Sequence, residues 1–199
     1  SLMQCAGDGY FIIPYTISNY LADEIKVDRF STDLPEFDEA EKAVTDKLQK
    51  LLNVNGTESV TSFHKRLGKI LWDYSGMSRN EEGLKKGLKL VDELQKEFWS
   101  NVRVPDTNEE LNQELERAGR VADFFEVAKI IIHDGLKRTE SCGAHFREES
   151  QTEGGEAMRK DKDFSYVAAW EFMGEEKDPK LHKEPLNYQY VEVKERSYK

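Results

Sequence analysis

The chain has 199 residues, of which 34% are charged and 38% are hydrophobic, and its formal net charge is −10 at pH 7. This length and apolar content suit one domain with a hydrophobic core and a tail, and they argue against a disordered chain. The acidic balance argues against nucleic acid and anionic membranes as direct partners, because affinity for phosphates comes mainly from Lys and Arg.

The cysteine and hydropathy patterns narrow the class of protein further. Cys5 and Cys142 lie far apart in unlike surroundings, which favours a reducing compartment over a disulfide framework. A transmembrane helix needs roughly 20 apolar residues, and the longest candidate run, 10–17, is broken by Pro14. The first residues lack the basic region of a signal peptide. We therefore expect a soluble chain without direct membrane insertion.

The opening segment, 2–22, is apolar and almost uncharged, and it contains Gly7, Gly9 and Pro14. Such a stretch is expected to be buried on several sides, whereas a free terminus is usually polar and frayed. We interpret the segment as the continuation of a preceding domain. Residues 26–35 are rich in polar residues and end in Pro35, which predicts a linker or surface loop.

Apolar residues then recur at steps of three and four, which predicts amphipathic helices. The first helix begins at Glu36 and ends at the turn 53–57, and the second ends at Gly76. Ser78 and Glu81 form a capping-box pattern that starts the third helix. The three apolar faces are Phe37, Ala40, Val44, Leu48 and Leu51; Val60, Phe63, Leu67, Ile70 and Tyr74; and Leu84, Leu88, Val91, Leu94 and Phe98. Trp72, Trp99 and Trp170 are expected to anchor the core.

Pro105 closes the third helix, and Asp106 or Asn108 is the predicted cap of a fourth. The apolar face of the fourth helix is Leu111, Leu115, Ala118, Ala122, Phe125 and Ile132. Short connections between such stripes favour antiparallel packing. Beyond Gly135 the periodicity stops, and the β-forming residues in 164–172 and 186–193 predict two paired strands. The fold class is therefore mainly α: an antiparallel three- to four-helix bundle with a small C-terminal β element.

The polar stretch after the fourth helix carries the candidate site. Glu140, His145 and Arg147 are spaced to form a buried polar network, with a solvated helix end as the alternative. Cys142 with His145 and His133 makes a weak metal-ligand pattern, because a second pair of ligands is missing. Cys142 as a nucleophile with His145 as its base lacks an orienting third group. We predict neither a metal site nor a catalytic set here.

The segment Glu140-Ser141-Cys142-Gly143-Ala144-His145-Phe146-Arg147-Glu148-Glu149 resembles the Glu-Ser-Arg-Gly-Ala-His-x-Arg-x-Asp/Glu stretch of the succinate dehydrogenase and fumarate reductase flavoprotein family. Three further pieces are similar to that family in the same order along the chain. They are Ser1-Leu2-Met3-Gln4 with 7–11, the helix start 76–84, and the ending Arg196-Ser197-Tyr198-Lys199. Cys142 departs from the pattern, because many members have Arg there.

This resemblance implies a parent FAD enzyme that interconverts succinate and fumarate and passes electrons to an iron–sulfur subunit. It implies three parts: 1–35, the tail end of the flavin-binding domain plus a linker; 36–139, a helical bundle domain; and 140–199, a polar loop and small C-terminal β element. Ser1 and Leu2 match positions that touch the flavin in the family. No catalytic residue is expected in this fragment, which should be inactive alone and bind no FAD.

The resemblance also assigns a structural role at a domain interface to the polar stretch. Its expected members are Glu140, Ser141, Gly143, His145 and Arg147. The implied partners are the flavin-binding and capping domains of the same subunit and the iron–sulfur subunit. The implied location is cytoplasmic, with membrane association through the parent complex. Two alternatives stay open: the C-terminal domain of an L-aspartate oxidase, and a free-standing helical interaction module without enzymatic activity.

Overall fold

The computed structural model describes residues 2–105, 111–174 and 177–194. The chain divides into two compact units, Ser1–Asp46 and Lys47–Lys199, and each is described by itself. The predicted boundaries at residues 35 and 139 are not tested by this division and remain predictions. Within the described residues, none of the helices combines the length and the apolar composition that crossing a bilayer requires.

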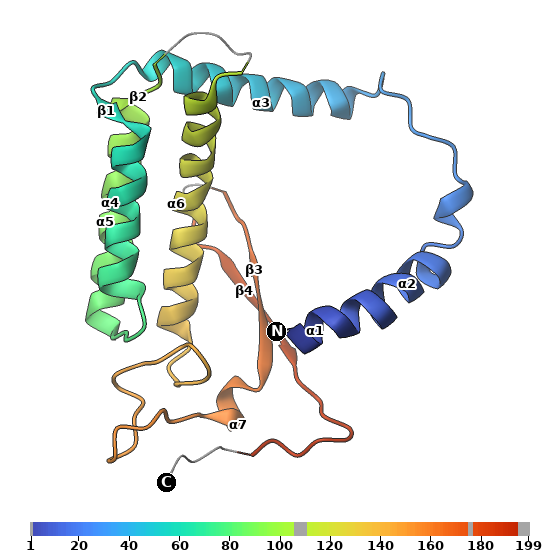
Figure 1. Ribbon diagram of the computed structural model, residues 1–199, viewed down its shortest axis with the longest axis vertical. Helices are drawn as coiled ribbons and strands as arrows, with labels where there is room; N and C mark the ends of the chain where they lie inside the picture. Colours follow the sequence, from blue (N-terminus) through green and yellow to red (C-terminus); the bar gives the residue numbers. More distant parts are fainter. Residues whose placement is uncertain (1, 106–110, 175–176, 195–199) are drawn as a thin grey trace. The chain divides into compact units, whose positions relative to one another are not determined.

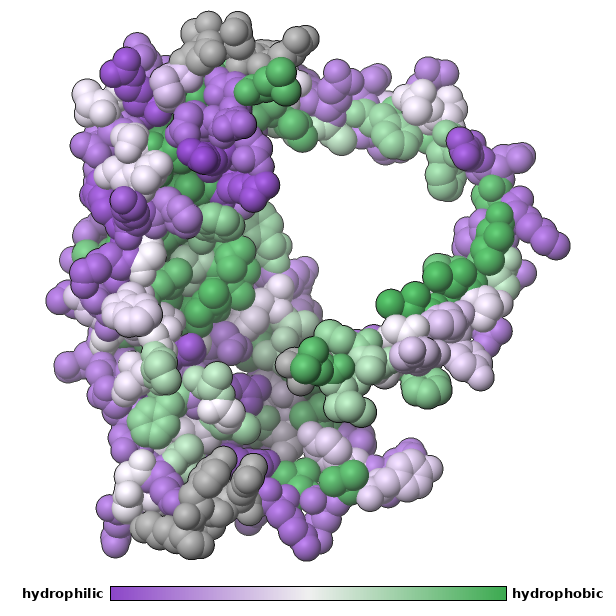
Figure 2. Space-filling model, in the orientation of Figure 1, coloured by the Kyte–Doolittle hydropathy of each residue, from purple (hydrophilic) through white to green (hydrophobic). Residues whose placement is uncertain are grey.

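The first unit begins with almost continuous helical backbone. Its elements are α1 (Leu2–Gly7), the π-type turns η1 (Asp8–Ile12) and η2 (Thr16–Tyr20) on either side of α2 (Ile13–Tyr15), and the short helix η3 (Glu24–Lys26). None of these elements contains a buried residue, and Figure 2 shows green and white side chains along the segment. The expected burial of 2–22 on several sides is therefore not met within the described residues.

The helix α3 (Pro35–Val54) passes from the first unit into the second. Of its predicted apolar face, Leu51 is fully buried and Leu48 is partly buried in the core of the second unit. Phe37 and Val44 belong to the first unit and are exposed there. Only the C-terminal part of α3 therefore contributes to the hydrophobic core.

The second unit is built on three long helices, α4 (Val60–Ser75), α5 (Glu81–Asn101) and α6 (Gln113–Lys137). Each of the three contacts both of the others, and Figure 1 shows them side by side. This arrangement confirms the predicted helical bundle. The buried core side chains are Leu51, Val60, Phe63, Leu67, Leu84, Val91, Leu94, Phe98, Val102, Leu115, Ala118, Val121, Ala122, Phe125, Ala128 and Ile132.

Aromatic rings join the three helices at the centre of this core. The ring of Phe98 in α5 lies 5.3 Å from that of Phe63 in α4 and 5.5 Å from that of Phe125 in α6. All three side chains are fully buried. Burial of each ring stabilises the fold by about 1.5–3 kcal/mol, with a further contribution from edge-to-face contact. The apolar faces predicted for α4, α5 and α6 therefore pack against one another in the core of the bundle.

The residue that caps the start of α5 differs from the predicted one. Asn80 has extended backbone, and its side-chain oxygen accepts a hydrogen bond from the N–H of Gly83 at 2.7 Å. Asn80 is therefore the N-cap of α5, and the predicted capping box of Ser78 and Glu81 is wrong. The hydroxyl of Ser78 instead donates to the carboxylate of Glu148 at 2.8 Å.

The start of α6 also differs from the prediction. Asn112 caps the helix by accepting from the N–H of Leu115 at 3.0 Å, whereas Asp106 and Asn108 lie outside the described residues. Leu111, which was predicted on the apolar face, has a φ of +58° and is fully exposed. It precedes the helix, so that prediction is wrong.

The end of α4 depends on a close backbone approach. Gly76 has a φ of −76°, so it is not the left-handed cap that glycine usually provides. A Cβ atom at Gly76 would lie 2.6 Å from the carbonyl oxygen of Trp72. Trp72 itself is 80% exposed, so the prediction that it anchors the core is wrong. It lies off the helical stripe that Phe63 and Leu67 define.

A short parallel pairing ties the start of α4 to the end of α5. The strand β1 (Glu58–Ser59) pairs with β2 (Val102–Arg103), with Glu58 opposite Val102. Gly56 donates its N–H to the carbonyl of Val102 at 3.0 Å. A Cβ atom at Gly56 would lie only 2.0 Å from the carbonyl oxygen of Asn101. Glycine is therefore required at this crossing.

The C-terminal β element is a two-stranded antiparallel hairpin preceded by the short helix α7 (Asp161–Phe164). Its strands are β3 (Tyr166–Glu171) and β4 (Lys180–Pro185), with Tyr166 opposite Pro185. The first strand confirms the prediction for 164–172. The second strand was predicted at 186–193, and that prediction is wrong. The backbone of β3 pairs instead with residues 180–185, which are weak β-formers. The indole N–H of Trp170 donates to Asp134 at 3.0 Å and fixes the hairpin to α6.

Candidate functional site

A polar cluster lies where α6 ends and α5 begins. We define it by the side chains of Ser78, Arg79, Asn80, Arg138, Glu140, Ser141, His145, Arg147, Glu148 and Glu149. Backbone hydrogen bonds join its two halves: Arg79 donates to the carbonyl of Phe146 at 3.0 Å, and Glu148 donates to the carbonyl of Arg79 at 2.8 Å. The cluster therefore brings the α4–α5 connection together with the segment after α6.

Arg147 is the most buried charged residue of the cluster, with 2% of its surface exposed. Its Nη1 donates to the carbonyl of Gly135 at 2.6 Å, and its Nε donates to Glu149 at 3.0 Å. Gly135 lies in the last turn of α6, where carbonyl groups lack partners within the helix. The guanidinium therefore completes the C-terminal end of α6, which also favours positive charge. Ser141 supports it by accepting the backbone N–H of Arg147 at 2.8 Å.

Two carboxylates cover the start of α5. Glu149 accepts the backbone N–H of Glu81 at 2.6 Å, and Glu148 accepts from Ser78 and Asn80, both at 2.8 Å. Burial raises the pKa of the Glu149 carboxyl, but hydrogen bonds from Arg147 and from backbone N–H groups outweigh it and hold the pKa at about 2. The Arg147–Glu149 ion pair thus links the C-terminal end of α6 to the N-terminal end of α5, where each charge complements the helix dipole.

Glu140 organises the other half of the cluster. It is 3% exposed, and it accepts from Arg138 at 2.7 Å and from the backbone N–H of Lys160 at 2.9 Å. Arg138 also donates to the carbonyl of Phe164 at 3.2 Å and lies over the ring of Tyr166. Glu140 therefore orders the segment that leads into the hairpin. Among the described residues, Glu140 forms no direct hydrogen bond with His145 or Arg147. Arg138 connects Glu140 to His145, because its Nη1 donates to Glu140 and its carbonyl accepts from Nε2 of His145.

His145 is held in a single tautomer by its two partners. Its Nε2 lies 2.7 Å from the carbonyl oxygen of Arg138, and its Nδ1 lies 3.1 Å from Nη1 of Arg79. A carbonyl only accepts and a guanidinium only donates, so Nε2 carries the proton and Nδ1 accepts. Burial lowers the pKa of His145, and the charges of Arg79 and Arg147 lower it further, against an opposing effect of the Arg138 carbonyl. The neutral imidazole is therefore the form that this geometry requires.

Gly143 forms the tight turn that presents His145. Cys142 and His145 exchange backbone hydrogen bonds of 2.8 and 3.1 Å, and Gly143 between them has a φ of +60°. Cys142 is exposed. Both ring nitrogens of His145 are engaged elsewhere, so His145 does not serve Cys142 as a base. Within the described ranges, no group of three or more His, Cys, Asp or Glu side chains is placed to hold a metal ion.

The two residues predicted to touch a flavin belong to the first unit. Ser1 lies outside the described residues. Leu2 begins α1 and is 86% exposed. Their contact with a flavin stays a prediction.

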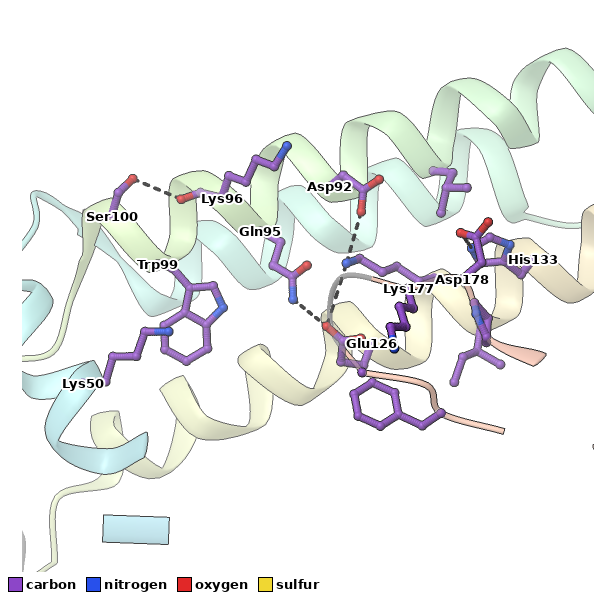
Figure 3. A pocket seen from close by; sticks show the side chains of 16 residues that line it. Lys50, Asp92, Gln95, Lys96, Trp99, Ser100, Glu126, His133, Lys177 and Asp178 are labelled. Atoms are coloured by element: carbon purple, nitrogen blue, oxygen red, sulfur yellow. Dashed lines mark hydrogen bonds and ion pairs between the residues drawn. The ribbon is translucent and has the colours of Figure 1, made fainter. Parts of the chain in front are cut away.

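A second feature, which the sequence did not predict, is a groove of about 620 Å³ between α5, α6 and the residues around the hairpin loop. Figure 3 shows Gln95 pointing toward Glu126, and Lys50 beside the ring of Trp99. Lys129 bonds to Asp92 at 3.1 Å, Gln95 bonds to Glu126 at 2.6 Å, and Lys50 lies 4.2 Å from the ring centre of Trp99. Asp92 is therefore paired with a lysine and Glu126 with an amide, whereas Asp178, which also lines the groove, is exposed and lies 3.9 Å from His133.

Residues 64–198 match the family described as Fumarate reductase flavoprotein C-term. The match covers more than half of the chain, and the chain belongs to this family. The finding confirms the resemblance inferred from the sequence, and it favours that interpretation over a free-standing helical module.

Individual relatives agree with this assignment. An uncharacterized FAD-dependent oxidoreductase of Methanocaldococcus jannaschii is 33% identical over 111 residues, which cover 56% of this chain and 20% of that protein. The fumarate reductase flavoprotein subunit of Escherichia coli is 32% identical over 104 residues, covering 52% of this chain and 17% of that subunit. The matched region is thus a fifth or less of the length of these relatives.

Solved structures show the same fold. A quinol fumarate reductase of E. coli aligns with a TM-score of 0.68 at 23% identity, covering 81% of this chain and 27% of that chain. The Sdh1 structure of Mycobacterium smegmatis aligns with a TM-score of 0.55 at 20% identity, covering 75% and 24%. At these identities the likeness supports the fold alone.

Proposed function

We propose that the protein containing this chain is an FAD-dependent oxidoreductase that interconverts succinate and fumarate and passes electrons to an iron–sulfur subunit. The observation that carries the proposal is the match of residues 64–198 to the C-terminal family of fumarate reductase flavoproteins. In the parent complex, the subunit would be cytoplasmic and would reach the membrane through its partners.

The described residues of this chain do not themselves fit an FAD site. A dinucleotide fold binds the pyrophosphate at a glycine-rich turn between a parallel strand and a helix, and no such unit occurs among the described elements. Leu2 is the only described residue matched to a flavin contact. We therefore assign the chemistry to the flavin-binding and capping domains of the parent subunit and derive no catalytic step from this chain.

The role proposed for this chain is structural: the helical bundle presents the polar cluster to the flavin-binding region. Glu140, Ser141 and Arg147 are all buried within the bundle end, and Gly143 turns His145 into a fixed orientation. A segment ordered by this many internal bonds is suited to preorganised contact, because little conformational entropy is lost on docking.

The test is to purify the full-length subunit and measure bound FAD and electron transfer with different substrates. We expect one FAD per subunit, succinate-dependent reduction of an artificial acceptor, and fumarate-dependent oxidation of a reduced dye. Oxidation of L-aspartate without activity on succinate would instead support the L-aspartate oxidase alternative. A full-length subunit that contains no flavin would contradict both.

A further inference from the structure

Arg79 has an unusual position within the polar cluster. It lies in the connection between α4 and α5 and is half-buried. Its Nε donates to the carbonyl of Gly76 at 2.9 Å, and its Nη1 donates to His145 at 3.1 Å. Both partners are neutral. Across the described ranges of the chain, no carboxylate forms an ion pair with Arg79, and its hydrogen bonds there use only Nε and Nη1, not Nη2.

The acidic groups nearest to Arg79 are already engaged. Glu148 binds Ser78 and Asn80, and Glu149 binds Arg147 and the start of α5. Asp134 accepts the indole N–H of Trp170 and attracts Arg79 only from beyond ion-pair distance. Both carboxylate oxygens of Glu148 and of Glu149 are therefore engaged, and Asp134 uses its Oδ1 for Trp170.

The charge of Arg79 is therefore incompletely compensated. Burial lowers the pKa of Arg79, the charge of Asp134 opposes that shift, and the neighbouring Arg147 adds to it. A partly buried guanidinium without a counter-ion is unfavourable. The hydrogen bonds to Gly76 and His145 nevertheless hold the planar group in one orientation, which is the arrangement that suits recognition of a carboxylate.

The pairing of charges within the cluster indicates the kind of ligand. Arg138 is paired with Glu140, Arg147 is paired with Glu149, and His145 is neutral in the tautomer required here. Among the described residues, Arg79 is therefore the one arginine of the cluster without an ion pair. A phosphate group carries more negative charge and usually binds several cations or a free helix N-terminus. The N-terminus of α5 is already covered by Glu149. A single carboxylate therefore matches the site better than a phosphate does.

We propose that Arg79 is the charged contact between this chain and the flavin-binding region of the same subunit, where it donates Nη2 to an Asp or Glu side chain. His145 is the positioning residue that fixes the guanidinium. This inference rests on the proposed function and deepens it, because it names the residue and the partner chemistry of the interface.

Carbodiimide coupling tests the proposal in the full-length subunit that carries Arg79→Lys. The introduced amine would form an amide with a carboxylate in contact, and peptide mass spectrometry would identify that carboxylate. We expect coupling to an Asp or Glu in the region preceding this chain. Arg66→Lys is the matched control, because Arg66 lies 2.6 Å from Glu97 and should couple to that residue within the chain.

Two results would overturn the proposal. One is coupling of the amine at position 79 only to Glu148, Glu149 or Asp134. The other is no coupling there while the control couples to Glu97. Bound FAD and succinate activity are measured first in the wild-type subunit, so a failure of the proposed function is seen independently of position 79.

A second measurement needs no substitution at position 79. Arginine modification by phenylglyoxal is followed in the 199-residue chain and in the full-length subunit. We expect Arg79 to react about tenfold more slowly in the full-length subunit, while the exposed Arg66 reacts at the same rate in both. Equal rates at Arg79 in the two proteins would refute the contact even if Arg79→Lys fails to fold.

Discussion

Replacing Arg147 with alanine removes the charge that connects the ends of two helices. In the folded chain its guanidinium donates to the carbonyl of Gly135 at 2.6 Å and to Glu149 at 3.0 Å, and only 2% of the residue is exposed. The substitution leaves a carbonyl without a partner at the end of α6, and it deprives Glu149 of its counter-ion. We expect a large loss of stability of the second unit.

The size of that loss follows from three contributions. A buried hydrogen bond to a charged donor contributes about 1.5–3 kcal/mol. The ion pair contributes about 0.5–1 kcal/mol, because the Glu149 side chain is 47% exposed and screened by solvent. Lost packing of the aliphatic stem adds about 1 kcal/mol. The total of about 4 kcal/mol corresponds to roughly a thousandfold change in the ratio of folded to unfolded chain.

Urea denaturation followed by circular dichroism measures this loss, and Arg66→Ala is the control. Arg66 forms a two-point ion pair with Glu97, but both side chains are more than a third exposed, so the control should cost less than about 1 kcal/mol. The full-length subunit carrying Arg147→Ala should also retain less flavin. Equal shifts of the urea midpoint for the two variants would refute the reasoning that Arg147 is the structural centre of the cluster.

Three further predictions concern stability, pH and cofactor binding. Gly56→Ala should destabilise the bundle by more than about 2 kcal/mol in the same urea assay, because the new Cβ would overlap the carbonyl of Asn101, 2.0 Å away; an unchanged midpoint would contradict the close approach. Since the folded-state pKa values of His145 and His133 are lowered mainly by burial, the unfolded chain binds more protons as pH falls below about 6.5, and stability present at neutral pH should be lost below that value. His145→Gln should reduce this loss and leave the part due to His133, whereas an identical pH profile would argue against the required neutral tautomer. The isolated chain should bind no FAD at micromolar concentration, and a yellow stoichiometric complex after purification would contradict that expectation.

The helical part of the fold was predictable because burial periodicity dominates it. Phe63, Phe98 and Phe125 lie at the expected steps of three and four along their helices, and all three are buried. Trp72 shows the limit of residue type as a signal, because its place on the helix, off the apolar stripe, decides its exposure. Helix caps were less predictable, since Ser78 and Asn80 are both good caps and only the backbone conformation decides between them.

The second strand and part of the site depend on contacts between distant residues. The alternation of Tyr188 and Tyr190 favours a strand, but pairing with β3 falls on 180–185, and Tyr190 is 94% exposed. Glu140, His145 and Arg147 stood out because a polar stretch follows the last apolar stripe, whereas Ser141 was assigned through the family resemblance. Arg79 did not, because its partner His145 is 66 residues away in the sequence. The only signal for Arg79 was its position within the family-like helix start 76–84.

The two ends of α5 are both fastened by backbone hydrogen bonds, although neither attachment forms a sheet of more than two strands. β1 and β2 hold its C-terminal end, and the bridge between Arg79 and Arg147 holds its N-terminal end, as the opposite placement of these segments in Figure 1 illustrates. Helix termini are usually the first parts of a helix to open. These two attachments restrain both termini of α5, so we expect its end turns to exchange amide hydrogens more slowly than the free ends of the other helices.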